Sequence, residues 1–242
     1  AFQYLPKTYV KGTPIPFVVI AHGGPEGQSR PTFSRWIQCL LHNGYGVMAP
    51  NVRGSTGYGR AFEEMDNYKN RKKSLMDYKA AIEYLIATGL TKPGMIGIDG
   101  GSYGGYVVYG MITEYPDLLS AAMSAVGIAN FQTFLENTAS YRRALRESEY
   151  GPLTDPEFLK EISPIWKADR IKTPLLVIHG VNDPRVPIGE ARQMIAAVQK
   201  NNGVVDSLIF ADEGHGASKR SNQIPEYRKS LEFLERYLRA KP

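Results

Sequence analysis

The sequence predicts an α/β fold in which helices cover both faces of a mostly parallel central sheet. Three observations predict it. Short apolar runs alternate with stretches in which apolar residues recur at helical spacing. The chain has 242 residues, which suits one domain with a large core. Polar, glycine-containing loops follow several of the apolar runs directly, at the edge of the sheet where ligands of such folds bind.

Six apolar runs predict buried strands, and the first few residues resemble the end of a further strand already in progress. The predicted strands are residues 17–21, 45–49, 95–98, 121–126, 174–179 and 204–211.

Helical spacing of apolar residues marks the segments between these strands. The predicted helices are residues 33–41, 75–86, 103–115, a segment around 194–198 and a C-terminal helix over 227–238. Residues 128–170 break the alternation, and we expect this insertion to cover the active site. The alternative is a helical excursion that only packs on the rim.

Composition excludes several functional classes. Apolar residues make up 43% and charged residues 22% of the chain, and the net charge is +5. The densest basic run, residues 69–73, precedes a helix and is typical of a solvated face, so no nucleic-acid partner is expected. No apolar stretch approaches the about 20 residues that span a bilayer, so no membrane contact is expected. The single cysteine, Cys39, forms no internal disulfide and is compatible with a cytoplasmic setting.

Ser102 is the predicted nucleophile. It lies at the centre of a Gly-x-Ser-x-Gly match between a strand and a helix, with Gly100 and Gly104 on either side. A side chain at either glycine would collide with neighbouring backbone, so the turn is tight and lifts the serine hydroxyl clear of the sheet. The same turn points the backbone N–H of Tyr103 toward the place where an oxyanion would form.

Asp183 and His215 complete a predicted catalytic triad. Each follows an apolar run directly, and the chain order Ser, Asp, His is that of α/β-hydrolases. His215 is predicted to be the base, and Asp183 is predicted to orient it. Asp99 is the rival carboxylate, but its place just before the nucleophile turn favours a structural role. Of the other histidines, His179 is expected to support Asp183.

The loop after the first predicted buried strand is expected to provide the second oxyanion donor. It reads His22-Gly23-Gly24-Pro25, and the N–H of Gly24 is favoured over that of Gly23. No cofactor is needed, and the histidines and the cysteine lack the spacing of metal ligands. The glycine-rich loop 51–59 lacks the ending of a phosphate loop, and its Arg53 either braces the loop or meets the substrate.

Together these residues resemble the catalytic domain of the prolyl oligopeptidase family of serine peptidases, and its acylaminoacyl-peptidase-like branch in particular. The motifs that carry this resemblance lie at residues 22–25, 51–59, 100–106, 180–187 and 213–216. The resemblance implies an α/β-hydrolase fold and cleavage of peptide, amide or ester bonds through an acyl-enzyme on Ser102. It also implies a primary specificity pocket, lined by Ile128, Phe131, Phe134 and Val186, that accepts an apolar residue on the acyl side of the bond.

The chain departs from this family in two ways. Some branches carry a tyrosine at the position of His22, so this site is expected to depend more on backbone donors. Residues 1–242 are expected to form a single α/β-hydrolase catalytic domain that lacks the first strands and any N-terminal β-propeller. The chain is therefore either a piece of a longer protein or a stand-alone hydrolase.

Three functions remain open at this point. The first is a serine peptidase acting on short peptides or N-acyl peptides. The second is a carboxylesterase acting on small esters, and the third is a catalytically silent interaction module. A homo-oligomer is compatible with each of them.

Overall fold

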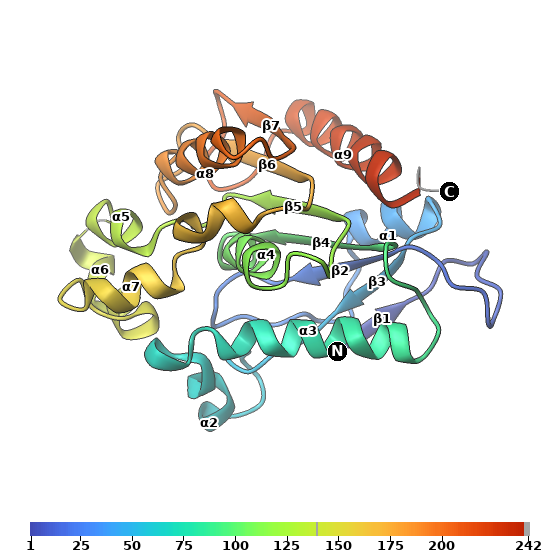
Figure 1. Ribbon diagram of the computed structural model, residues 1–242, viewed down its shortest axis with the longest axis horizontal. Coiled ribbons are helices and arrows are strands. Elements are labelled where there is room, and N and C mark those ends of the chain that lie inside the picture. The colour runs from blue at the N-terminus through green and yellow to red at the C-terminus, as the bar shows by residue number, and fades with distance from the viewer. Residues whose placement is uncertain (139, 240–242) are drawn as a thin grey trace.

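The computed structural model describes residues 1–138 and 140–239. Seven strands form one sheet in the order β1-β3-β2-β4-β5-β6-β7 (Figure 1). Only β1 is antiparallel, and it pairs with β3. The strands are β1 (Phe2–Tyr4), β2 (Phe17–Ala21), β3 (Gly46–Ala49), β4 (Ile96–Gly101), β5 (Ala121–Ala125), β6 (Leu175–Gly180) and β7 (Val205–Phe210).

These strands confirm the mostly parallel sheet, and most observed bounds lie within a residue of those predicted. The exception is β4, which runs on to Gly101 instead of stopping near Ile98. Its last glycines remain paired with β5, where Gly101 lies opposite Ala125. Glycine interrupts the run of apolar side chains but keeps the backbone hydrogen bonds of the strand, so the apolar pattern ends before the strand does.

Helices cover both faces of the sheet (Figure 1). Between the sheet and these helices lie two separate hydrophobic cores. The larger core lies under α3 (Lys73–Ala87), α4 (Tyr103–Glu114) and α8 (Gly189–Lys200). The smaller core lies under α1 (Arg35–His42) and α9 (Arg220–Leu234). Alternate residues along the central strands enter opposite cores. Val19 lies in the larger core and Val18 in the smaller one, which is the period-two pattern of a sheet buried on both sides.

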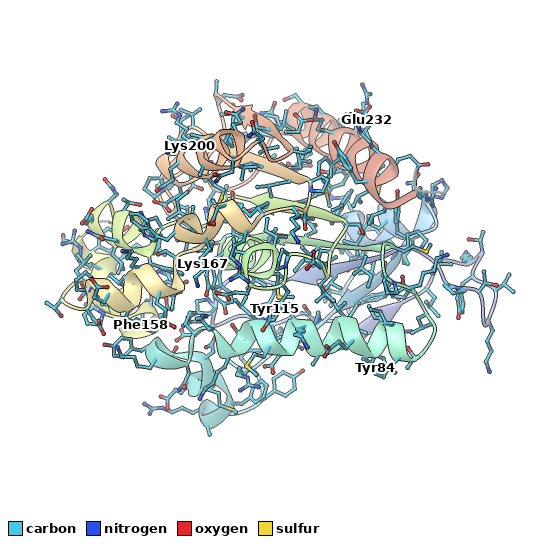
Figure 2. All side chains as sticks on the ribbon, viewed as in Figure 1. Tyr84, Tyr115, Phe158, Lys167, Lys200 and Glu232 are labelled. Carbon is cyan, nitrogen blue, oxygen red and sulfur yellow. The ribbon has the colours of Figure 1, made fainter. Side chains whose placement is uncertain are left out.

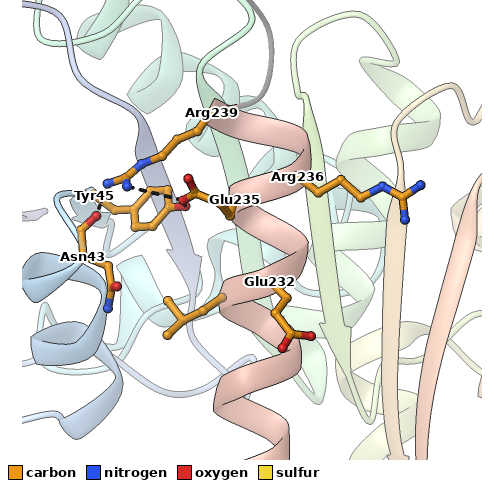
Figure 3. Close-up of a pocket in the computed structure, with 7 residues that line it drawn as sticks. Asn43, Tyr45, Glu232, Glu235, Arg236 and Arg239 are labelled. Carbon is orange, nitrogen blue, oxygen red and sulfur yellow. Dashed lines mark hydrogen bonds and ion pairs between the residues drawn. The ribbon is translucent and has the colours of Figure 1, made fainter.

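The end of the last helix contacts Tyr45, the residue just before β3. After α9 the chain continues into the short π-helical segment η4 (Glu235–Arg239). The Tyr45 hydroxyl donates a hydrogen bond to Glu235 Oε2 (3.2 Å), and the Arg239 guanidinium lies 4.6 Å from the centre of the Tyr45 ring. Figure 3 shows these side chains lining a pocket, on the sheet face covered by α1 and α9.

The insertion at residues 128–170 is wholly helical in the segments that the structure assigns. It contains α5 (Phe131–Glu136), α6 (Ser140–Tyr150), α7 (Pro156–Ile162) and the 3-10 segment η3 (Pro164–Arg170). Lys167, labelled in Figure 2, donates to Glu114 Oε1 at the end of α4 (2.5 Å). This ion pair joins the insertion to the helix that begins immediately after Ser102.

Three short elements between β3 and α3 carry no periodic signal in the sequence. They are α2 (Arg60–Glu63) and the 3-10 turns η1 (Glu64–Asp66) and η2 (Tyr68–Asn70). A segment of three or four residues is too short to display a helical stripe, so the pattern alone does not detect it. None of the helices in the described parts of the chain is long and apolar enough to cross a membrane.

Candidate active site

Ser102 occupies a strained turn between β4 and α4. Its φ is 60° and its ψ is −119°, a backbone conformation that L-residues rarely adopt. The Ser102 N–H donates to Ala125 O at the end of β5 (2.9 Å), and Ser102 O accepts from the Tyr106 N–H (3.1 Å). The strand and the helix therefore hold the serine from both sides. The turn has the geometry of a nucleophile elbow.

The glycines around Ser102 permit close approach of backbones. A Cβ on Gly104 would lie 2.1 Å from Ala21 O at the end of β2, and a Cβ on Gly100 would lie 2.5 Å from Gly104 O. Real side chains do not tolerate such distances, so the turn requires glycine at both positions. The predicted collisions are confirmed.

Asp183 and His215 are brought together from two different loops. Asp183 follows β6 and His215 follows β7, and their Oδ2 and Nδ1 atoms lie 2.7 Å apart. The Asp183 side chain is fully buried, and its Oδ1 accepts the N–H groups of Arg185 (2.8 Å) and Val186 (3.0 Å). Parallel strands bring the two loops to the same edge of the sheet as the end of β4.

The electrostatics at Asp183 select one tautomer of His215. Burial raises the pKa of Asp183, but the hydrogen bonds from His215, Val186 and Arg185 outweigh it, and the net pKa is lowered. The carboxylate is therefore ionised at neutral pH and only accepts hydrogen bonds. His215 must donate through Nδ1, which leaves Nε2 available as a base.

The hydroxyl of Ser102 makes no hydrogen bond to His215 in the described chain. Ser102 is half-buried, and 17% of the His215 side chain is exposed. Hydrogen bonds of this kind are often long in a free enzyme and tighten when substrate binds. The structure thus shows the Asp183–His215 pair assembled and the serine presented at the same edge of the sheet.

The His215 loop is organised by a carboxylate of the motif at residues 213–216 to which the sequence assigned no role. Glu213 is buried, and its two oxygens accept the Ser218 N–H (3.1 Å), the Ser218 hydroxyl (2.9 Å), the Lys219 N–H (2.9 Å) and the Asn222 amide (2.8 Å). The hydrogen bond from Asn222 is the largest contribution, and together these bonds lower the pKa of Glu213 to about 2. Its place in that motif, two residues before His215, is the signal that could have indicated it.

The loop at residues 22–25 lies beside Ser102. A Cβ on Gly23 would lie 3.7 Å from Ser102 Cβ, and Gly24 has a φ of 138°. His22 fastens this loop to the next one: Nδ1 bonds to Gly23 O (2.9 Å) and Nε2 to the Ser55 hydroxyl (2.9 Å). Because a carbonyl only accepts, Nδ1 carries the proton. Burial lowers the pKa of His22, so Nε2 accepts from Ser55.

Two other polar residues singled out in the sequence, His179 and Asp99, have hydrogen-bond partners within the fold. His179 Nε2 donates to Val186 O (2.9 Å) and lies 3.6 Å from Asp183 Oδ2, so it packs directly behind the Asp183 carboxylate. Asp99 lies in β4, three residues before Ser102, and accepts a hydrogen bond from Trp36 Nε1 (2.7 Å). Burial raises the pKa of Asp99 to about 6.

The four residues predicted to line the specificity pocket are all buried. Ile128, Phe131, Phe134 and Val186 are 3% exposed or less. The ring of Phe131 packs on Tyr150, with the centroids 4.7 Å apart. Val186 adjoins Asp183 through its backbone N–H. Their contact with a substrate stays a prediction.

Arg53 is engaged by a carboxylate of α3. Its Nε and Nη2 donate to Asp77 Oδ2 (2.8 Å) and Oδ1 (2.6 Å), and its own N–H also donates to Oδ2 (3.0 Å). This bidentate pair braces the loop at residues 51–59, which is one of the two roles that the sequence left open. A contact with substrate stays a prediction. Within residues 1–138 and 140–239, no cluster of three His, Cys, Asp or Glu side chains could hold a metal ion.

Comparison with known proteins places this chain in a family. The sequence profile of the prolyl oligopeptidase family matches residues 31–241. The chain belongs to the prolyl oligopeptidase family. Among curated members, it is 36% identical over 215 residues to dipeptidyl aminopeptidase BIII of Pseudoxanthomonas mexicana, covering 86% of this chain and 31% of that protein. It is 31% identical over 236 residues to dipeptidyl peptidase family member 6 of Caenorhabditis elegans, covering 95% of this chain and 32% of that protein.

Solved structures of peptidases share the fold. A puromycin-hydrolyzing peptidase of Mycobacterium tuberculosis superposes with a TM-score of 0.89 and 31% identity, covering 96% of this chain and 36% of that one. The acylaminoacyl peptidase of Pyrococcus horikoshii gives a TM-score of 0.90 and 27% identity, covering 99% and 40%. These likenesses confirm the α/β-hydrolase fold. The chain spans about a third of the length of the curated relatives described above.

Proposed function

We propose that this chain carries the catalytic machinery of a serine peptidase, with Ser102 as nucleophile, His215 as general base and Asp183 as the group that orients His215. The observation that carries this proposal is the 2.7 Å hydrogen bond between Asp183 and His215, at the same edge of the sheet as a strained serine turn. A buried Asp that holds a partly exposed His, beside a half-buried serine in a strained turn, is the arrangement that activates a hydroxyl.

The reaction divides into two steps. Ser102 Oγ attacks the carbonyl carbon of the scissile bond while His215 Nε2 takes its proton. The N–H groups of Tyr103 and Gly24 stabilise the negative oxygen of the tetrahedral intermediate. The intermediate collapses, the amine leaves with the proton from His215, and an acyl-enzyme remains. Water then attacks the ester by the same route and restores the free Ser102 hydroxyl.

The proposed substrates are short peptides or N-acyl peptides with an apolar residue on the acyl side of the bond. Two observations support this. The curated relatives carry the names of dipeptidyl peptidases and of acylamino-acid-releasing enzymes. The four predicted pocket residues are apolar and buried, and Phe131 belongs to an aromatic cluster that reaches Tyr103 through Tyr150. The peptidase names favour an amide substrate over the small ester of an esterase.

The test is covalent labelling of the chain with a fluorophosphonate, read by intact mass and peptide mapping. We expect a single adduct on Ser102 and none in Ser102→Ala, with both proteins melting within a few degrees of each other. Hydrolysis of a Phe or Leu peptidyl anilide should exceed that of the matched Lys and Asp anilides. Turnover that persists in Ser102→Ala would refute the assignment. A folded wild-type chain that takes no label would indicate a silent scaffold.

A further inference from the structure

A buried ion pair lies outside the proposed triad and has no part in the reaction described above. Asp66 ends the turn η1, and Arg71 follows the turn η2. They are 1% and 0% exposed, and Arg71 Nη1 donates to Asp66 Oδ2 (2.5 Å). Burying two charges costs free energy that their attraction offsets only in favourable geometry. A buried ion pair therefore does not by itself indicate that it stabilises the fold. Its contacts with neighbouring residues indicate what else it does.

The first contact is with the residue that follows the nucleophile. The Tyr103 hydroxyl donates to Asp66 Oδ2 (3.0 Å), and the Ser74 hydroxyl lies 2.8 Å from the same phenol oxygen. Tyr103 is 1% exposed, so water does not compete for these bonds. Asp66 therefore holds the far end of the side chain whose backbone N–H is the proposed oxyanion donor.

The second contact reaches the other side of the oxyanion hole. The Arg71 guanidinium lies 5.2 Å from the ring centre of Tyr103 and 4.9 Å from that of Tyr150. Its Nη2 donates to Glu149 O on α6 (2.6 Å). The Tyr150 hydroxyl in turn donates to Gly24 O at 3.5 Å. The Arg71 guanidinium thus connects Tyr103, the residue of the first proposed oxyanion donor, through Tyr150 to Gly24, the residue of the second.

We propose that Asp66 and Arg71 are positioning residues for the oxyanion hole, acting through the side chains of Tyr103 and Tyr150. This inference rests on the proposed function. Oxyanion donors accelerate a reaction only where they are already fixed at the place the negative charge will occupy, so a slightly displaced donor loses much of its effect. The nucleophile turn alone fixes Tyr103 at its backbone. The ion pair fixes it at the phenol, and arginine suits this role because its flat group contacts both rings at once.

The sharpest test compares two Tyr→Phe variants on the same helix. Tyr103→Phe removes the hydroxyl that Asp66 holds. Tyr106→Phe removes an equally buried hydroxyl, one turn later, that has no hydrogen-bond partner among the described residues. Both variants keep the aromatic ring. We measure kcat and KM on a peptidyl anilide, the inhibition constant of a matched peptidyl aldehyde, and the melting temperature.

For Tyr103→Phe we expect kcat to fall about 10-fold with KM nearly unchanged, because a displaced donor costs part of the about 10²–10³ lost when a donor is removed. The aldehyde forms a hemiacetal whose oxygen occupies the oxyanion hole, so its affinity should fall by a similar factor. Tyr106→Phe should stay within about twofold of wild type in both. Ser74→Ala removes one of the two polar contacts of the Tyr103 hydroxyl, so it should lower kcat by a smaller factor. This variant replaces Tyr103→Phe in the test if Tyr103→Phe does not fold.

Three outcomes are distinguishable. A Tyr103→Phe variant that keeps kcat within about twofold of wild type overturns the proposal. A variant that melts earlier but binds the aldehyde as wild type does also overturns it, because the contacts then serve stability alone. Absence of fluorophosphonate labelling in the wild-type chain would refute the proposed function itself. Labelling of the wild-type chain is therefore measured before any variant is compared.

Discussion

Replacing Asp183 with asparagine changes one atom in the centre of the proposed triad. The carboxylate accepts three hydrogen bonds: Oδ2 from His215, and Oδ1 from the N–H groups of Arg185 and Val186. An asparagine that keeps the two backbone bonds must turn its NH2 group toward His215. Two donors then face each other, and His215 can relieve this only by moving its proton from Nδ1 to Nε2. The opposite amide orientation would set NH2 against both backbone N–H groups.

We expect Asp183→Asn to lower kcat strongly and the folding free energy only slightly. With its proton on Nε2, His215 cannot accept the proton of Ser102. In the general Ser-His-Asp template, this substitution lowers kcat by about 10⁴, which is about 5.5 kcal/mol in the activation barrier. The charge-assisted bond to His215 is exchanged for a neutral one, which costs less than the about 1.5–3 kcal/mol that a hydrogen bond to a charged group contributes, so the variant should remain folded.

The assay is kcat on a peptidyl anilide together with the rate of fluorophosphonate labelling, with thermal melting as the check on folding. Asp212→Asn is the matched control. Asp212 lies in the same loop as His215 but is exposed and pairs with Lys219, so its variant should stay within about twofold of wild type. An Asp183→Asn variant that is folded and retains more than about a tenth of the wild-type kcat would refute the orienting role.

Two further predictions concern the dependence of stability on pH. The pKa of Glu213 is lowered to about 2, first by the hydrogen bond from Asn222, so its contribution is fully present above about pH 4.5 and lost as pH falls toward about 2. Glu213→Gln should therefore lower the melting temperature near neutral pH, and its difference from wild type should shrink on acidification; a difference independent of pH would contradict this. Burial, together with Asp99, raises the pKa of Glu226 to about 7, so the folded state holds this proton more tightly than the unfolded chain and stability falls as pH rises from about 4.5 to about 7. Glu226→Gln should raise the melting temperature by about 3 °C near pH 8 and leave it unchanged near pH 4. The reason is that ionising this partly exposed carboxyl costs about 1 kcal/mol of folding free energy, which corresponds to that shift in a domain of this size. A stabilisation that is equal at both pH values would contradict the prediction.

The layout of the sheet could be predicted from consecutive residues. The strand at residues 17–21 is apolar at every position because both of its faces are buried, and its bounds match β2 as observed. The turn at Ser102 is equally local, because the glycines that permit it lie within two residues of it. The adjacency of Asp183 and His215 also followed from the sequence, since parallel strands bring the loops at their carboxyl ends to one edge.

The polar contacts that hold these residues in place depended on the tertiary structure. Asp66 and Tyr103 are 37 positions apart, and Arg53 and Asp77 are 24 apart. Charged residues have no periodic pattern that identifies which of them will be buried or with which partner. That choice follows from how the loop after β3 closes against α4 and the insertion. By itself the sequence determined the order of the main strands and helices and the turn at Ser102, because those depend on near neighbours. Only the packing of distant segments decided which charges surround the site, since the partner that compensates a buried charge is supplied by another part of the chain.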